Sequence, residues 1–319
     1  MNGAPEPKDA KVGARTHRTF ARALFACGAM SLAACQVLFG IDEFVAAEDP
    51  DAATPDGAKP DVVVPSGTDG GDAEASIPPV GDDGGCPVNR GPTMVRIGAL
   101  CIDSTEVTEA QYDAFYSSVP PATANQPPEC TWNQTFQVGK GLPEEPTFCS
   151  SGDGVHPVRC VDQCDALAFC KWAGKRLCGA PGGFDGDYNG FADPTKSEWM
   201  AACTGDAGVV FPYGNTFDDQ RCNGLAGPGK GKPTIAGNLV NCEGPVKGLF
   251  DLSGNVHEWE AACIPGDGGG GAAGDRCRIR GGSTTDSNPD LLKCAALNGA
   301  QRNFQASNVG FRCCATAMP

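Results

Sequence analysis

Apolar residues recur at helical spacing in three short stretches of this chain, and each stretch has a start signal. The predicted helices begin after Thr108, extend from about Asp162 to Ala173, and follow Asp193-Pro194. The first starts with the capping box Thr108-Glu109-Ala110-Gln111, after which Tyr112 and Phe115 lie on one face. In the second, Leu167 and Cys170 are the inward positions. These faces predict three short amphipathic helices packed on a core.

The ends of the second and third helices carry their own signals. Gly174 follows the second helix, where a residue with positive φ commonly ends a helix, and Asp162 is its candidate N-cap. Asp193-Pro194 offers a cap and a proline at the first helical position, ahead of Trp199 and Cys203. Both helices are therefore predicted to be short and bounded.

Strand signals are brief and glycine-rich segments are many. Short strands are expected at Met94–Ile97, Cys277–Arg280 and Val309–Cys313. Strands and helices do not alternate regularly along the chain, so the predicted sheet is antiparallel and loops predominate.

The first 34 residues have the pattern of an export signal. Five basic residues precede the apolar run Ala23–Ala34, which is too short to span a bilayer. The run ends in Leu32-Ala33-Ala34-Cys35, which resembles the lipobox of bacterial lipoproteins. We predict a signal peptide over residues 1–34 and a lipid on Cys35 that anchors an exported protein to the outer membrane or cell surface. The alternative is an ordinary secretory signal in which Cys35 is incidental.

Composition separates a spacer from a folded domain. Residues 42–85 hold twelve acidic side chains and one basic, with many Pro, Gly and Ala, so 35–85 is predicted to be a disordered linker. Residues 86–319 hold 18 basic and 25 acidic side chains and are predicted to form one domain. The domain has no basic stripe, which argues against a nucleic-acid partner.

Cysteine usage predicts a disulfide framework. Apart from Cys27 in the leader and Cys35, sixteen of the eighteen cysteines remain, an even number in an exported chain. No pair has the two-residue spacing of a zinc knuckle, so disulfides are favoured over zinc. Spacing suggests the pairs Cys86 with Cys101, Cys222 with Cys242, and Cys263 with Cys277.

Eight short sequence motifs resemble those of formylglycine-generating enzymes and occur in the same order, over roughly residues 95–315. They are Val107–Tyr112, His156–Val158, Ala173–Leu177, Ser197–Trp199, Phe211–Asn215, Gly248–Trp259, Arg280–Ser283 and Val309–Cys313. The resemblance implies an irregular, loop-rich α+β fold, distantly similar to C-type lectins, with few short helices and structural calcium. It also implies disulfides from Cys170 to Cys313 and from Cys203 to Cys294. Because Cys314 adjoins Cys313, either could reach Cys170, leaving the other for Cys178.

The chemistry of that family requires two cysteines soon after Arg280–Ser283, which bind copper(I) and drive oxidation of a substrate cysteine. Asp286 stands at the first of these positions, and no second cysteine precedes Cys294. Copper is therefore not expected. The mature chain has only His156 and His257, both expected to be packing or surface residues, so non-haem iron is not expected either. No catalytic residue is predicted.

Calcium has a better set of candidate ligands. The resemblance implies one site formed by Asp251, the backbone carbonyls of Gly254 and Val256, and Glu258, all of which offer hard oxygen ligands. A second family site near Asn223 lacks its acidic residue. Separately, Asp185–Asp193 resembles the start of an EF-hand loop, but Lys196 replaces the bidentate glutamate, and a simple turn is as good an interpretation.

Two functions follow from these residues. The favoured one is a non-catalytic, surface-anchored module that binds protein or glycan. The alternative is an oxidoreductase that converts a substrate cysteine to formylglycine.

Overall fold

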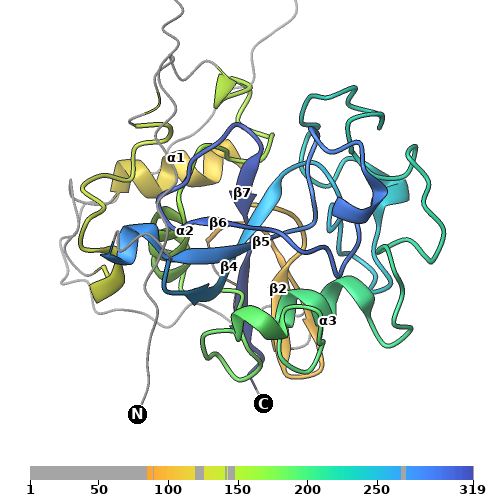
Figure 1. The fold of residues 1–319 in the computed structure, drawn as a ribbon, viewed down its shortest axis with the longest axis horizontal. Coiled ribbons are helices and arrows are strands. Elements are labelled where there is room, and N and C mark those ends of the chain that lie inside the picture. Colours follow the sequence, from red (N-terminus) through yellow and green to blue (C-terminus); the bar gives the residue numbers. More distant parts are fainter. Residues whose placement is uncertain are drawn as a thin grey trace, which may run out of the picture. The chain divides into compact units, whose positions relative to one another are not determined.

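The computed structural model describes residues 85–88, 90–118, 126–140, 142, 148–266 and 271–318, which form a loop-rich domain with two small sheets (Figure 1). The predicted leader, Cys35 and nearly all of the linker lie outside the described residues. The α-helices are α1 (Glu109–Ser118), α2 (Gln163–Trp172) and α3 (Glu198–Thr204). The strands are β1 (Met94–Ile97), β2 (Leu100–Asp103), β3 (Arg176–Leu177), β4 (His257–Ile264), β5 (Arg276–Arg280), β6 (Gly299–Gln301), β7 (Val309–Phe311) and β8 (Cys313–Thr316). Short 3₁₀ turns are η1 (Pro128–Cys130), η3 (Tyr188–Gly190), η4 (Val240–Cys242), η5 (Gly271–Gly274) and η6 (Pro289–Leu291). Among the described residues, no helix has the length and apolar character needed to cross a membrane.

The first sheet joins the two ends of the domain. Its order is β1-β2-β8-β3, with antiparallel pairing throughout and Ile102 opposite Cys314. The last strand therefore lies inside this sheet and not at its edge. The first and last strands of the described domain are thus held together by main-chain hydrogen bonds.

The second sheet has the order β6-β5-β4-β7. Its pairs are antiparallel, as expected, apart from β4 with β7, which are parallel and place Trp259 opposite Phe311. A parallel pair needs a long crossover connection, which the segment containing β5 and β6 supplies. The strand predicted at Val309–Cys313 is in fact divided between the two sheets, and Arg312 is the residue at the junction.

Caps define the helices largely as predicted. In α1, the Thr108 amide donates to the Gln111 side chain at 3.0 Å. In α2, Asp162 is the N-cap and forms a reciprocal capping box with Asp165. The predicted start of the third helix is wrong, because α3 begins at Glu198 with Ser197 as its cap. Asp193 instead accepts a hydrogen bond from the Thr195 amide at 2.9 Å and closes a turn before the helix.

The main core is aromatic and lies between α1, α2 and the second sheet. Tyr112 and Phe115 of α1 contact Phe169 of α2, with ring centroids 5.9 and 5.7 Å apart, and Phe169 lies 5.3 Å from Phe311. A second cluster surrounds Trp199 of α3. Burial of these rings provides most of the apolar contact that the short elements could not make alone.

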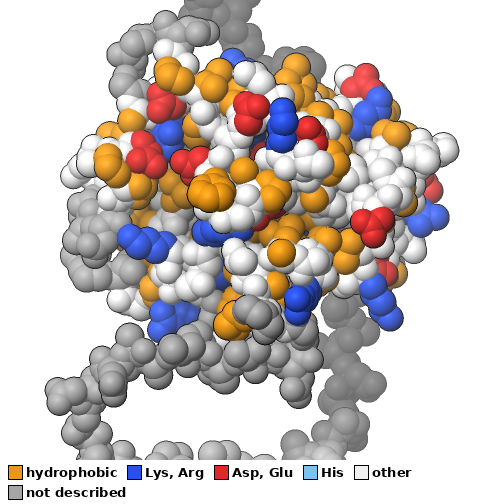
Figure 2. Space-filling view, turned by 90° about the horizontal axis from the view of Figure 1, so that it is seen from below, with side chains coloured by type: hydrophobic (Ala, Val, Ile, Leu, Met, Phe, Trp, Pro, Cys, Tyr) orange, Lys and Arg blue, Asp and Glu red, His pale blue; other side chains and the backbone are white. Residues whose placement is uncertain are grey.

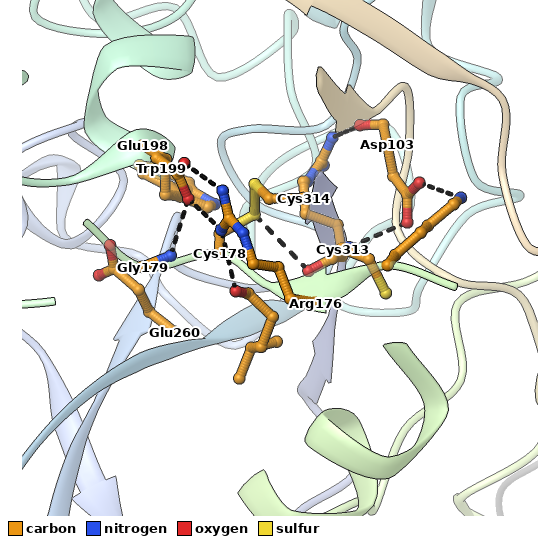
Figure 3. The surroundings of a disulfide bond; sticks show 12 residues. Asp103, Arg176, Cys178, Gly179, Glu198, Trp199, Glu260, Cys313 and Cys314 are labelled. Atoms are coloured by element: carbon orange, nitrogen blue, oxygen red, sulfur yellow. Dashed lines mark hydrogen bonds and ion pairs between the residues drawn. A yellow bond between two sulfur atoms is a disulfide. The ribbon is translucent and has the colours of Figure 1, made fainter. Parts of the chain in front are cut away.

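Eight disulfides use all sixteen cysteines of the described domain. They are Cys86–Cys101, Cys130–Cys164, Cys149–Cys160, Cys170–Cys313, Cys178–Cys314, Cys203–Cys294, Cys222–Cys242 and Cys263–Cys277. The structure thus contains every pair expected above and resolves the ambiguity at the adjacent cysteines. Around Cys178–Cys314, Arg176 of β3 makes a bidentate ion pair with Glu198 of α3 (Figure 3). In the chain-entropy account, a disulfide that closes a loop as long as that between Cys170 and Cys313 stabilises the folded state by roughly 4–5 kcal/mol.

Surface charge on the face shown in Figure 2 is mixed, with acidic, basic and apolar side chains interspersed. No basic stripe is visible on that face.

A buried ion pair connects β2 to the turn after α2. Lys175 Nζ lies 2.5 Å from Asp103 Oδ1, and neither side chain is exposed to solvent. The other Asp103 oxygen accepts a hydrogen bond from the Cys313 amide at 2.9 Å. Burial raises the pKa of Asp103 to about 6, although Lys175 opposes the shift. Burial likewise raises the pKa of Asp162 to about 6.

These raised pKa values predict that the domain loses stability as pH rises through 6. The folded state binds these protons more tightly than the unfolded chain, so their contribution is complete below an ordinary aspartate pKa of 3.8 and is lost above about 6. For Asp103 the change is about 3 kcal/mol. Thermal unfolding in chelator should therefore give a higher Tm at pH 5 than at pH 7.5. Asp103→Asn should lower Tm at pH 7.5 and flatten this dependence; a wild-type Tm that is flat or higher at pH 7.5 would contradict the assignment.

Candidate functional site

Glu258 of β4 lies at the centre of a cluster of buried residues that come from several of the motifs. Its Oε2 accepts hydrogen bonds from Trp199 Nε1 and Arg312 Nε, both at 2.7 Å, and its Oε1 accepts from another Arg312 nitrogen, also at 2.7 Å. Burial alone would lower the pKa of Arg312, but the charge and hydrogen bonds of Glu258, together with the charges of Glu106 and Asp251, outweigh burial and raise that pKa. Arg312 is therefore charged, and both Glu258 oxygens accept hydrogen bonds.

Two further carboxylates lie in the same buried region. Glu106 and Asp251 are almost entirely inaccessible to solvent. Asp251 Oδ2 accepts from the Gly237 amide at 2.6 Å, and Glu106 Oε1 accepts from Asn255 Nδ2 at 2.9 Å. The remaining oxygens, Asp251 Oδ1 and Glu106 Oε2, are buried without a hydrogen-bond partner among the described residues. A proton shared between the side chains of Glu106 and Asp251, which lie within hydrogen-bonding distance of each other, or an added cation would satisfy these oxygens.

The electrostatics of this cluster are unfavourable as it stands. Burial, and then the negative charge of Asp251, raise the pKa of Glu106 well above its ordinary value. Burial also raises the pKa of Asp251 to about 6. Three carboxylates face one guanidinium, that of Arg312, so a proton or a cation must balance the excess negative charge.

The predicted calcium residues are only partly assembled into a ligand set. Asp251 and Glu258 belong to the same buried cluster, and Gly254 and Val256 lie on the segment between them. Asp251 offers a free oxygen, whereas the oxygens of Glu258 are engaged by Arg312 and Trp199. Over the described part of the chain, no group of three or more His, Cys, Asp or Glu side chains is arranged to hold a metal ion. A cation here would therefore depend on backbone carbonyls as well as on carboxylates.

The backbone of this loop is tightly constrained. Asp251 and Asn255 have φ of 60° and 58°, and Gly254 has φ of 78°. A Cβ on Gly254 would come within 2.6 Å of the backbone of Asn223. Asn223 Nδ2 donates to Asn255 Oδ1 at 3.1 Å, so Asn223 acts here as a structural clamp.

The EF-hand-like segment folds into local turns. Asp187 Oδ1 accepts from the Asn189 amide at 2.9 Å and caps η3. Asp193 caps the next turn, as described above. The simple-turn interpretation of Asp185–Asp193 accounts for both contacts.

The loop after β5 is organised around Asp286, at the position where the family's catalytic chemistry needs a cysteine. Asp286 Oδ2 accepts from the amide of Ser283 at 2.8 Å and from its hydroxyl at 2.9 Å, and His257 Nε2 lies 3.1 Å away. Asn308 Nδ2 donates to Ser283 Oγ at 3.0 Å. Burial would raise the pKa of Asp286, but His257 and Ser283 outweigh it and hold that pKa below its usual value. Asp286 is therefore an ionised anchor for the loop.

His257 is expected from the sequence to be a packing or surface residue, and it is buried. Sequence reasoning missed its contact with Asp286, whose Oδ2 lies 3.1 Å from His257 Nε2. The available signal is that both positions depart from the family pattern, since His257 stands where a tryptophan is usual and Asp286 where a cysteine is needed. Local sequence does not connect the two positions, because only the fold brings them together.

This constellation is not a hydrolase triad. The Ser283 hydroxyl donates to Asp286, and Ser283 is fully buried. A nucleophilic serine would instead donate to the histidine and face an open cleft. Cys294, the nearest cysteine after the loop, is bonded to Cys203. The loop therefore contains a stabilising polar network and no free thiol.

Comparison with known proteins places these features in a family context. The family described as "Sulfatase-modifying factor enzyme 1-like domain" matches residues 47–317. The "Inactive C-alpha-formylglycine-generating enzyme 2" of Bos taurus is 33% identical over 195 residues, covering 54% of this chain and 57% of that protein. The "Formylglycine-generating enzyme" of Thermomonospora curvata is 28% identical over 307 residues, covering 81% of this chain and 94% of that protein. The chain thus spans little more than half the length of the bovine relative.

Among solved structures, the crystal structure of CarF aligns with a TM-score of 0.43 and 21% identity, covering 69% of this chain and 87% of that one. The structure of PvdO from Pseudomonas aeruginosa aligns with a TM-score of 0.45 and 19% identity, covering 69% and 80%.

The His257–Asp286 pair should contribute measurably to stability. His257→Gln and Asp286→Asn should each lower the free energy of unfolding by about 1–3 kcal/mol, because each leaves a buried polar partner unsatisfied. The double variant should lose less than the sum, giving a coupling energy of about 0.5–3 kcal/mol in denaturant titrations. The exposed pair Lys293–Asp290 is the control, where coupling should stay under about 1 kcal/mol. Equal coupling at the two pairs would show that His257 and Asp286 do not act together.

Proposed function

The chain belongs to the family of sulfatase-modifying factor enzyme 1-like domains, and we propose that it uses this fold as a surface-anchored, non-catalytic binding module. The observation that carries the proposal is the chemistry of the loop after β5. Asp286 stands there as an ionised carboxylate paired with His257, and Cys294 is bonded to Cys203. Copper(I) prefers soft thiolate ligands, which a carboxylate does not replace.

Cysteine oxidation state supports the same conclusion. The sixteen cysteines of the described domain are all in disulfides, so none is available as a thiolate in this state. The bovine relative is itself named as inactive. The alternative function, conversion of a substrate cysteine to formylglycine, draws on the similarity to the Thermomonospora curvata enzyme over most of that enzyme's length.

Activity distinguishes the two functions directly. Copper-treated protein, incubated with oxygen and a cysteine-containing sulfatase peptide, should produce no aldehyde above a matched blank, because the thiolate pair is missing. The Thermomonospora curvata enzyme serves as the positive control. In parallel, alkylation of the unreduced domain should label none of the sixteen cysteines. Aldehyde formation that a serine scan of those cysteines abolishes would establish the enzymatic function instead.

Calcium has a role in this proposal as a stabilising ion. The fit rests on Asp251 Oδ1 and Glu106 Oε2, buried oxygens without partners, in a cluster with excess negative charge. Hard carboxylate and carbonyl oxygens are the ligands that calcium prefers. Asp251, Glu106 and the carbonyls of Gly254 and Val256 would hold the ion, with Glu258 kept in place by Arg312. Glu106 is an addition to the set that the sequence predicted.

Calcium should then raise the Tm of the domain, since a ligand that binds only the folded state stabilises it by mass action, by about 2.7 kcal/mol at a hundredfold excess over Kd. Asp251→Ala should remove most of this increase. Asp187→Asn, in the EF-hand-like turn, is the matched control and should retain it. An equal calcium response in wild type and Asp251→Ala would place the ion elsewhere, and loss of the response in Asp187→Asn would point to that turn.

Anchorage at the surface is the remaining part of the proposal, and it rests on Leu32-Ala33-Ala34-Cys35 and the acidic segment that follows. Cys35→Ser should release the protein from the membrane fraction and move it from the detergent phase to the aqueous phase in phase partitioning. Cys27→Ser, which changes a cysteine within the leader, should leave partitioning unchanged. A Cys35→Ser protein that remains in the detergent phase would contradict lipidation there.

A further inference from the structure

A surface cavity of about 380 Å³, lined by both polar and apolar side chains, lies between the segment after η1 and the segment before β7. The residues that matter in its lining are Trp132, Gln134, Lys140, Asp162, Asn303 and Gln305. They come from three parts of the chain that the fold brings together. None of them takes part in the network around Glu258 or in that around Asp286.

Trp132 presents only its ring to the cavity. Its side chain is partly exposed, and its one donor, Nε1, is already used by the Glu129 carbonyl at 2.8 Å. An aromatic face with no free polar atom is a surface for stacking against C–H groups.

Part of the hydrogen-bonding capacity around the ring has no partner among the described residues, although Gln134 Nε2 already donates to the Thr131 carbonyl at 3.0 Å. The side chains of Asn303 and Lys140 make no hydrogen bond or ion pair to other described residues. Gln305 Nε2 donates to Asp162 Oδ2 at 3.2 Å, but its Oε1 is buried without a partner among those residues. A carboxamide offers donors and an acceptor in one plane, which complements neighbouring hydroxyl groups, each both donor and acceptor.

The net charge of the cavity lining indicates which class of ligand fits it. One ammonium, Lys140, and one carboxylate, Asp162, give the lining no net charge, which disfavours a phosphate or a metal ion. A lipid chain would leave the polar groups of Asn303, Gln305 and Lys140 without hydrogen-bond partners. A ring with apolar C–H faces and several hydroxyls satisfies both the tryptophan and the amides.

The cavity is also rigid on one side. The Cys130–Cys164 disulfide ties the segment carrying Trp132 to α2. Asn133 Nδ2 donates to Asp165 Oδ1 at 2.9 Å, and Asp162 is held by the α2 capping box. Preorganised side chains lose less entropy on binding, so a small ligand gains affinity.

We propose that this cavity is a binding site for neutral sugar units of a glycan, stacked on Trp132 and hydrogen-bonded by Asn303 and Gln305. The proposal names the ligand class of the binding function inferred above and rests on it. The glycan contacts this cavity, while the family's catalytic loop remains a scaffold.

The test is binding of the purified protein to a panel of immobilised cellohexaose, chitohexaose and maltohexaose, with polygalacturonate as an anionic comparison. At least one neutral hexaose should bind. Trp132→Ala should weaken that binding by about tenfold or more, and Asn303→Ala by about threefold, while Trp132→Phe should restore most of the affinity because a ring is again present. Phe184→Ala and Asn241→Ala, at exposed positions elsewhere, are the matched aromatic and amide controls and should bind as wild type.

Asn303→Ala and Lys140→Ala remove no side-chain hydrogen bond to another described residue, so they remain informative if Trp132→Ala fails to fold. Binding that is unaffected by Asn303→Ala and equally weakened by Phe184→Ala would overturn the site. Binding of none of the neutral hexaoses, or of polygalacturonate alone, would also overturn it. The two proposals are tested by different assays. Failure to bind sugar would reject this site and leave the non-catalytic function unaffected. Aldehyde formation would reject the non-catalytic function and leave the sugar-binding result unaffected.

Discussion

A buried ion pair, Glu258 with Arg312, is the contact on which the two sheets depend. Glu258 lies on β4 of the second sheet, and Arg312 is the residue between β7 of that sheet and β8 of the first. Arg312 also donates to the carbonyls of Asp103 and Phe250, at 3.0 and 2.9 Å, so one guanidinium joins several segments. Removing one partner of such a pair typically costs about 3–5 kcal/mol, since it leaves a buried charge uncompensated.

Around that pair, covalent bonds substitute for regular secondary structure. The strands have two to eight residues and the helices seven to ten, so few elements could fold on their own. Cys313 and Cys314, directly after Arg312, bond to Cys170 and Cys178 and fix β8 to the helical side of the domain. The ion pair sets the position of the last strand, and the disulfides maintain it.

In the loop after β5, an aspartate stands where the family's catalytic chemistry needs a cysteine. A thiolate there would have to remain reactive, whereas Asp286 is held by Ser283 and His257 and stabilises its own loop. This explains how the scaffold tolerates the change. In the proposed binding function, the ligand contacts another surface, the cavity beside Trp132, where Gln305 Oε1 is buried without a partner among the described residues.

The sequence by itself determined the features that depend on neighbours along the chain or on family words. The caps at Thr108 and Asp162, the export signal pattern and the missing copper cysteines could all be seen there, and the resemblance supplied two long-range disulfides. Tertiary structure alone decided the rest. In the folded structure, Cys170 bonds to Cys313 and not to Cys314, and Val309–Cys313 is divided between two sheets. Arg312 occupies both oxygens of Glu258, and His257 contacts Asp286. Each of these contacts joins side chains that are 20 or more residues apart in the sequence. Local spacing carries no information about contacts between such distant residues. In a loop-rich chain, the burial of side chains brings the segments together, and periodicity does not.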